Sequence, residues 1–208
     1  NGAIDLNAGT DLIVNNDAVV STVGTGAITG DAVRAIAIST TTAAVQSVAG
    51  DITLLANGTT GTVASFDGIS VNDATISTTT GAISLTGTGG DTGDDNHGVS
   101  LTNTGTISST GNDAADPDQV RVMGTAVFGA NSDGVNATNA ASHTFISTVD
   151  AAVSIIGNSA TDDGVLLLES HSTTTGLGGS ITIMGTTTGT GGDADGVTAI
   201  SSAMSTMG

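Results

Sequence analysis

A short phrase that recurs along the chain constrains its fold more than any other feature. The phrase is Gly-x-Ile-x-(Leu/Ile), and complete copies begin at Gly2, Gly50, Gly81 and Gly179. Gly26-Ala27-Ile28 opens in the same way, and Ala152-Val153-Ser154-Ile155 is a degenerate copy. The first four isoleucines, Ile4, Ile28, Ile52 and Ile83, are 24, 24 and 31 residues apart. Recurrence at such a period indicates a repeat architecture.

Two further phrases follow the first one within each later unit. One is a polar residue, then Gly, then Val or Ile: Asp67-Gly68-Ile69, His97-Gly98-Val99, Asp133-Gly134-Val135, Asp163-Gly164-Val165 and Asp195-Gly196-Val197. The other is an apolar residue before Ser or Thr: Ile76-Ser77-Thr78, Ile107-Ser108-Ser109, Ile146-Ser147-Thr148 and Met204-Ser205-Thr206. The unit therefore has three short segments and occurs about seven times, near residues 2–25, 26–49, 50–80, 81–114, 115–149, 150–178 and 179–208.

Each segment alternates apolar and polar residues, which predicts a half-buried β-strand. One such unit cannot bury its own apolar face, but stacked units can form a continuous core. We therefore predict an all-β fold: a parallel β-helix, or three-sided β-solenoid, of about seven coils of 24–36 residues. It would form a single domain over residues 1–208 and be a segment of a larger repetitive protein. The alternative is a pair of immunoglobulin-like sandwiches, but the chain has no Trp or Tyr for their cores.

Composition excludes several classes of protein. The chain has 20 acidic and 2 basic residues, a net charge of −18, so it offers no basic surface for nucleic acid. No apolar stretch approaches the ~20 residues of a membrane-spanning helix, and we predict no membrane insertion. With no Cys, disulfides and thiolate metal sites are impossible.

Acidic residues concentrate where loops are inserted between the first and second segments. The candidate ligands are Asp91, Asp94, Asp95, Asp162, Asp163, Asp193 and Asp195. Stacking would bring these loops close together, and Ca²⁺ takes six to eight oxygen ligands from Asp, Asn and carbonyl groups. We therefore name Ca²⁺ as the one candidate cofactor. The alternative is that Asp suits turns and keeps the surface soluble, and neither the tandem nonapeptide motif nor the EF-hand motif is present.

The residues needed for catalysis are scarce. Arg34 and Arg121 lie in separate units, and His97, His143 and His171 accompany no nucleophile elbow of the G-x-S-x-G type. A polysaccharide-active β-helix enzyme is thus the least favoured interpretation, and we expect no catalytic residues.

Segments such as Gly81-Ala82-Ile83-Ser84-Leu85-Thr86-Gly87, followed by Gly98-Val99-Ser100-Leu101 and Gly105-Thr106-Ile107-Ser108-Ser109, resemble the repeat regions of bacterial surface proteins. They are similar to filamentous-haemagglutinin-type and autotransporter-type adhesins and to large β-strand-repeat fibre proteins. The resemblance implies a right-handed parallel β-helix, secretion to the cell surface, and a role in adhesion or in extracellular fibres.

Two functions follow from this interpretation. The first is a structural, non-catalytic protein of an extracellular fibre, sheath or surface layer, which associates with itself end to end or side by side. The second is an adhesin stalk or binding module that contacts a cell surface or a surface glycan. For the second, the best candidate for a patch that breaks the repeat is the stretch Asp116–Ala130, with Pro117, Arg121, Met123 and Phe128.

Overall fold

The computed structural model describes residues 2–57, 64–111, 120–176, 179–190 and 194–207, and for 139–143 the backbone only. Over these ranges the chain forms nineteen β-strands and no helix, and every strand pairing is parallel. The predicted all-β class is therefore confirmed. None of the described segments is a helix with the length and hydrophobicity needed to cross a membrane.

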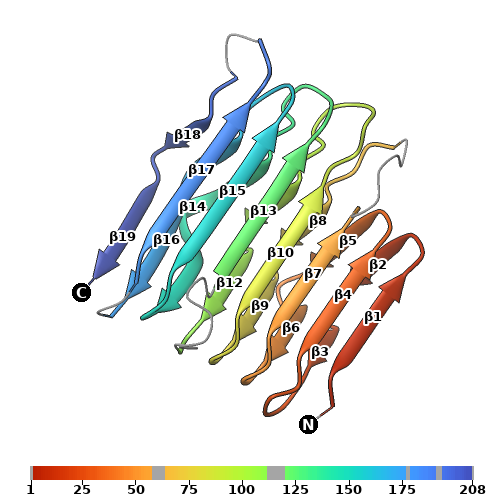
Figure 1. Cartoon of the computed structure of the whole chain (residues 1–208), viewed down its shortest axis with the longest axis vertical. Coiled ribbons are helices and arrows are strands. Elements are labelled where there is room, and N and C mark those ends of the chain that lie inside the picture. Colours follow the sequence, from red (N-terminus) through yellow and green to blue (C-terminus); the bar gives the residue numbers. More distant parts are fainter. Residues whose placement is uncertain (1, 58–63, 112–119, 177–178, 191–193, 208) are drawn as a thin grey trace.

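The first strand of every unit belongs to one seven-stranded sheet, which we call the first column. Its strands follow one another in sequence order across the molecule, so the two termini lie at opposite ends (Figure 1). They are β1 (Ile4–Ala8), β4 (Ile28–Ala32), β7 (Ile52–Ala56), β10 (Ile83–Thr88), β13 (Val120–Ala126), β15 (Val153–Ser159) and β17 (Ile181–Thr187).

The second and third segments of the units form two further stacks. The second column holds β2 (Asp11–Val14), β5 (Ala35–Ser39), β8 (Ile69–Asn72), β11 (Val99–Asn103) and β18 (Val197–Ile200). The third column holds β3 (Val19–Ser21), β6 (Ala44–Ser47), β9 (Thr75–Thr78), β12 (Thr106–Ser109) and β19 (Ala203–Met207). β14 (Val135–Val149) and β16 (Val165–Thr175) run through both columns.

Because of β14 and β16, the second and third columns belong to a single twelve-stranded sheet. The structure therefore has two sheets, not the three separate faces expected of a three-sided form. Earlier units break between the columns at residues with positive φ, such as Asp73 (54°) and Asn103 (55°). In β14 and β16 the strand continues across this border with two register shifts, between Thr138 and His143 and between Thr144 and Ile146, although Glu169 of β16 also has a positive φ (50°).

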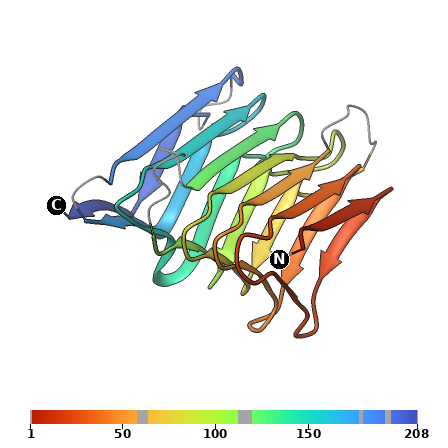
Figure 2. The same cartoon turned by 60° about the horizontal axis from the view of Figure 1, so that its bottom comes forward.

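The core lies between the two sheets (Figure 2) and consists of stacked apolar side chains. In the first column Ile52 pairs with Ile83, and the same position continues through Val120 and Val153 to Ile181. Ile52 and Ile83 are fully buried, whereas Ile181 in the last unit is only partly buried. The aligned isoleucines confirm the register that the recurring phrase predicts.

The fifth unit departs from the recurring phrase in sequence but keeps the same strand pairing. Its first strand, β13, has Val120 at the isoleucine position and no Gly two residues before it. The strand pairs in unbroken register with β10 and β15, so the predicted break in the repeat is absent from residues 120–126. Pro117 lies outside the described residues.

Candidate functional site

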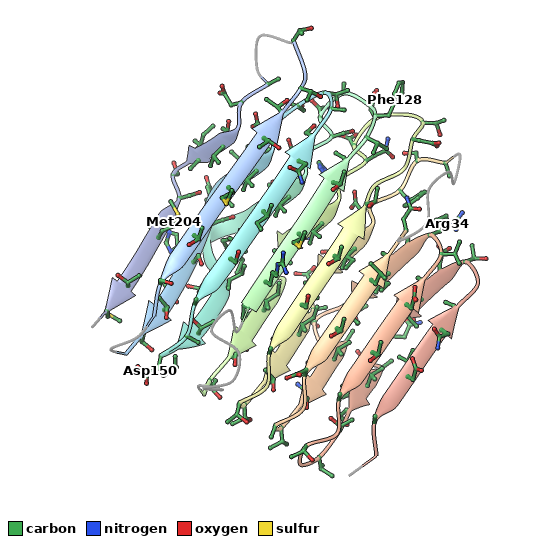
Figure 3. The ribbon with its side chains drawn as sticks, in the orientation of Figure 1. Arg34, Phe128, Asp150 and Met204 are labelled. Atoms are coloured by element: carbon green, nitrogen blue, oxygen red, sulfur yellow. The ribbon has the colours of Figure 1, made fainter. Side chains whose placement is uncertain are left out.

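The inserted loops of the later units gather at one edge of the molecule, where the first column passes into the second. Arg34 and Phe128 lie along this edge, and Asp150 lies at the opposite one (Figure 3). Five residues stand here immediately before the second-column segments of their units, and we call them the edge ladder: Asp67, His97, Asp133, Asp163 and Asp195. The residues two positions after them pair in register, from Ile69 through Val99, so the five residues are stacked.

Glycine allows the loops to close tightly at their base. A Cβ added to Gly124 in β13 would lie 1.8 Å from the carbonyl oxygen of Gly134, and one added to Gly157 would lie 1.8 Å from that of Gly164. No side chain can occupy such a position without moving the backbone, because real Cβ contacts are much longer. The two strands therefore approach each other directly, and the loop residues between them project outward.

Each of the first four rungs of the edge ladder accepts a hydrogen bond from the backbone N–H of the next rung. The backbone N–H of His97 donates to Oδ1 of Asp67 (3.0 Å), and that of Asp133 donates to Nδ1 of His97 (3.1 Å). The N–H of Asp163 donates to the Asp133 carboxyl group, and that of Asp195 donates to Oδ1 of Asp163 (2.8 Å). The side chains thus satisfy backbone donors that no strand pairing reaches.

Burial shifts the pKa values of three side chains in the edge ladder. Desolvation raises the pKa of Asp67 to about 6, against the opposing hydrogen bonds from His97 and Ser100. Desolvation also lowers the pKa of His97 to about 4, although Asp95 favours the charged ring. The amide group of Asn136 also lies against this ring, with its Nδ2 3.1 Å from Nε2 of His97.

Asp133 is the most strongly perturbed rung, at 2% exposure. Desolvation raises its pKa to about 7, and the nearby carboxylates of Asp162 and Asp163 contribute to the same rise. Each of the three residues offers a ligand oxygen within 4.8 Å of the others. Two things can reduce the repulsion among these carboxylates. One is a proton shared among them, and the other is a hard cation, which takes carboxylate oxygens as ligands.

The predicted metal ligands divide between this cluster and other surroundings. Asp162 and Asp163 belong to the cluster. Asp94 accepts a hydrogen bond from the Ala130 N–H (3.0 Å), and the N–H of Asp95 donates to the Ala130 carbonyl oxygen (3.0 Å). Asp91 has a shielded Oδ1 with no hydrogen-bond partner within the described ranges.

Asp195 is exposed and only its N–H joins the ladder, while Asp193 lies outside the described residues. The sequence prediction missed Asp133. The shared phrase Asp133-Gly134-Val135 and Asp163-Gly164-Val165 places Asp133 directly beside Asp163 once the units are stacked, and this signal could have identified it.

The other polar candidates do not converge on this site. Arg34 pairs with Asp11 of the preceding unit, with Nε 2.7 Å from Oδ1, and lies over the Phe66 ring at 5.9 Å from its centroid. Arg121 is exposed on β13, and His171 lies on the third column. The side chain of His143 lies outside the described residues.

Comparison with models of protein families, with curated proteins and with solved structures finds no match to this chain.

Proposed function

We propose that the chain is a structural, non-catalytic β-solenoid, a right-handed parallel β-helix, that stacks end to end in an extracellular fibre, sheath or surface layer. The observation that carries this proposal is the parallel stack of repeated units, in which each unit covers the core of the one before it. Val165 in the sixth unit is fully buried, whereas Val197, its partner in the seventh, is 43% exposed. Val197 faces the core, so a further unit laid on β17, β18 and β19 would bury it.

The opposite end supports the same stacking. β1 and β17 are the outer strands of the first column, and each pairs on one side only. Outer strands present unpaired N–H and C=O groups that template another strand. Because every pairing in the stack is parallel and Ile4 occupies the position of Ile181, β1 of a second copy would continue the column on β17.

Substitution in the last unit tests end-to-end association. Val197→Asp would place a charge on the core-facing side of β18, whereas Thr198→Asp changes the outward side of the same strand and is the matched control. We expect filaments in electron micrographs of the native chain and of Thr198→Asp, and isolated particles of Val197→Asp. Isolated particles of the native chain at high concentration would contradict the proposal.

We further propose that Ca²⁺ binds at Asp133, Asp162 and Asp163 and stabilises the stack. The closely spaced carboxylates support this proposal. Free Ca²⁺ at about 100 times Kd would stabilise the fold by about 2.7 kcal/mol, measured as a higher melting temperature in millimolar Ca²⁺ than in chelator. Asp133→Asn should lose this response and Asp94→Asn should keep it. Equal melting temperatures of the native chain in Ca²⁺ and in chelator would contradict Ca²⁺ binding.

An adhesin stalk or binding module is the second candidate function. It is favoured by the loop after β13, where Val127 is 42% and Phe128 is 52% exposed. An exposed aromatic side chain on an outward loop is typical of contact surfaces. Binding to cells or to immobilised surface glycans that Phe128→Ser abolishes, with filaments unchanged, would favour this function over the structural one.

A further inference from the structure

Four of the five residues of the edge ladder are Asp followed directly by Gly: Asp67-Gly68, Asp133-Gly134, Asp163-Gly164 and Asp195-Gly196. The first of these pairs is held at two points by His97 of the next unit. The N–H of His97 donates to Oδ1 of Asp67 (3.0 Å), and the carbonyl oxygen of His97 accepts the N–H of Gly68 (2.9 Å). One neighbouring residue therefore engages both the carboxyl group and the glycine nitrogen of the pair.

The next two pairs are held in the same way. The N–H of Asp163 donates to the carboxyl group of Asp133, and the carbonyl oxygen of Asp163 accepts the N–H of Gly134 (3.0 Å). Asp195 makes the equivalent contacts: its N–H lies 2.8 Å from Oδ1 of Asp163, and its carbonyl oxygen lies 2.9 Å from the nitrogen of Gly164. Each of these pairs is thus fixed by the unit that follows it.

Asp195-Gly196 differs from the other three pairs. Asp195 is exposed, and within the part of the chain that the structure describes neither its carboxyl group nor the N–H of Gly196 forms a hydrogen bond. Residue 196 also has no side chain to shield its backbone nitrogen. The carboxyl group of Asp195 is therefore free to turn back toward the nitrogen of Gly196.

We propose that Asp195-Gly196 is a site of spontaneous isoaspartate formation and that the edge ladder protects the other three pairs. The nitrogen of Gly196 attacks Cγ of Asp195, a C–N bond forms, and the carboxyl OH and the amide proton leave as water. Water then adds to the backbone carbonyl carbon of the five-membered succinimide and breaks its bond to the Gly196 nitrogen. The chain is left linked through the side-chain carbon of residue 195, with no atom gained or lost overall.

Protection follows from the two-point contact. At the other three pairs the carboxyl group and the glycine nitrogen must both lose hydrogen bonds before they can meet. Their reaction therefore requires local opening of the stack, and only a small fraction of folded molecules is open at any time. Asp195-Gly196 reacts without such opening.

Isoaspartate would add one methylene carbon to the backbone just before β18. A second copy stacked on this end would then lose the contacts that the inner units make at this position. Conversely, a copy already stacked there would hold Asp195-Gly196 as the inner pairs are held. This consequence rests on the end-to-end association proposed above, whereas the modification site itself does not.

The test is a timed incubation of the dilute native chain at neutral pH. Digestion with a protease that cleaves before Asp but not before isoaspartate, followed by mass spectrometry, measures each pair separately. Asp195 should convert at least about tenfold faster than Asp67, Asp133 or Asp163, because only those three need local opening. In urea all four should convert at similar rates. Equal rates at Asp163 and Asp195 in the folded chain would overturn the inference, as would conversion of Asp195 in urea alone.

Asparagine variants give a second readout, because the same attack on Asn expels ammonia and hydrolysis then leaves a carboxylate of different mass. Asp195→Asn should change in mass during incubation. The matched control, Asp67→Asn, keeps an acceptor for the His97 N–H and should remain an amide. Loss of both amides at the same rate would contradict protection by the ladder.

Incubated filaments distinguish this inference from the proposed function. Protection of Asp195 in filaments would support end-to-end stacking on the last unit. Isoaspartate at Asp195 in filaments would contradict that stacking, while the difference between Asp195 and the inner pairs in the dilute chain would still establish the modification site.

Discussion

The first two units and the last four have the same stacked core, but they differ in the connection between the first column and the second. In the first two units only a few residues join the first column to the second, and Ala8 and Ala32 occupy the ends of their first strands. In the later units Gly87 and Gly124 stand at the equivalent positions, and longer loops follow. The core columns continue through both regions without a change of register. Strand alternation therefore sets the core in both regions, and the third unit, with Ala56 at the glycine position and a long loop after it, shows that a loop can also leave without this glycine.

The largest expected effect tests whether both regions share one core. Ile28→Ala in the early region and Ile83→Ala in the later one each remove a fully buried side chain from the same position of the first column. Both should lower the free energy of unfolding by about 3–4 kcal/mol, measured by urea denaturation. If either substitution lowered the free energy of unfolding by less than about 1 kcal/mol, the two regions would not share one core.

The second prediction concerns the glycine contact that only the later region uses. Gly124→Ala should destabilise the fold by about 3 kcal/mol, because its Cβ would overlap the Gly134 carbonyl oxygen. The reverse change in the early region, Ala32→Gly, should cost only about 1 kcal/mol, since it removes a methyl group and adds backbone freedom. Equal unfolding midpoints for the two variants would show that the loops do not depend on this contact.

The third prediction uses the first rung of the edge ladder. The folded pKa of Asp67, about 6, lies above its ordinary value of 3.8, so the native fold loses stability as pH rises from about 4 to 6. Asp67→Asn keeps an acceptor for the His97 N–H but cannot ionise. It should gain about 2 kcal/mol over the native chain at pH 8, and the gain should vanish near pH 4. A gain independent of pH would contradict burial of an ionisable Asp67 carboxyl group as its cause.

The smallest expected effect concerns His97, and its dependence on pH is opposite to that of Asp67. The folded pKa of His97, about 4, lies below its ordinary value of 6.5, so the unfolded chain takes up a proton first as pH falls. The native fold should lose stability between about pH 6.5 and 4. His97→Asn keeps an acceptor for Asp133 and should be about 1 kcal/mol more stable than the native chain at pH 5, with little difference at pH 8 in thermal melts. A larger difference at pH 8 than at pH 5 would count against a buried neutral His97.

The sequence predicted the parts of the fold that depend on local alternation. The Ile52 and Ile83 positions, and the valines after Gly98 and Gly134, align as the phrases indicate. It did not predict the merging of the second and third columns, because β14 has Asn139 in register with the turn residue Asn103 and yet continues as a strand across two register shifts. Asp133 could have been predicted, because the shared phrase aligns it with Asp163, but it is a single acidic residue without an acidic neighbour and the search followed clusters of Asp in the loops.

One distance tests the stacking of units directly. Asp5 and Thr182 occupy the same outward position of the first column, six strand spacings apart. The chain has no native Cys, so Cys substitutions at these two sites can be spin-labelled selectively. Pulsed electron paramagnetic resonance should give one narrow distribution near 29 Å, from about 4.8 Å per strand. A broad distribution, or one centred far from this value, would contradict a continuous stack from the first unit to the last.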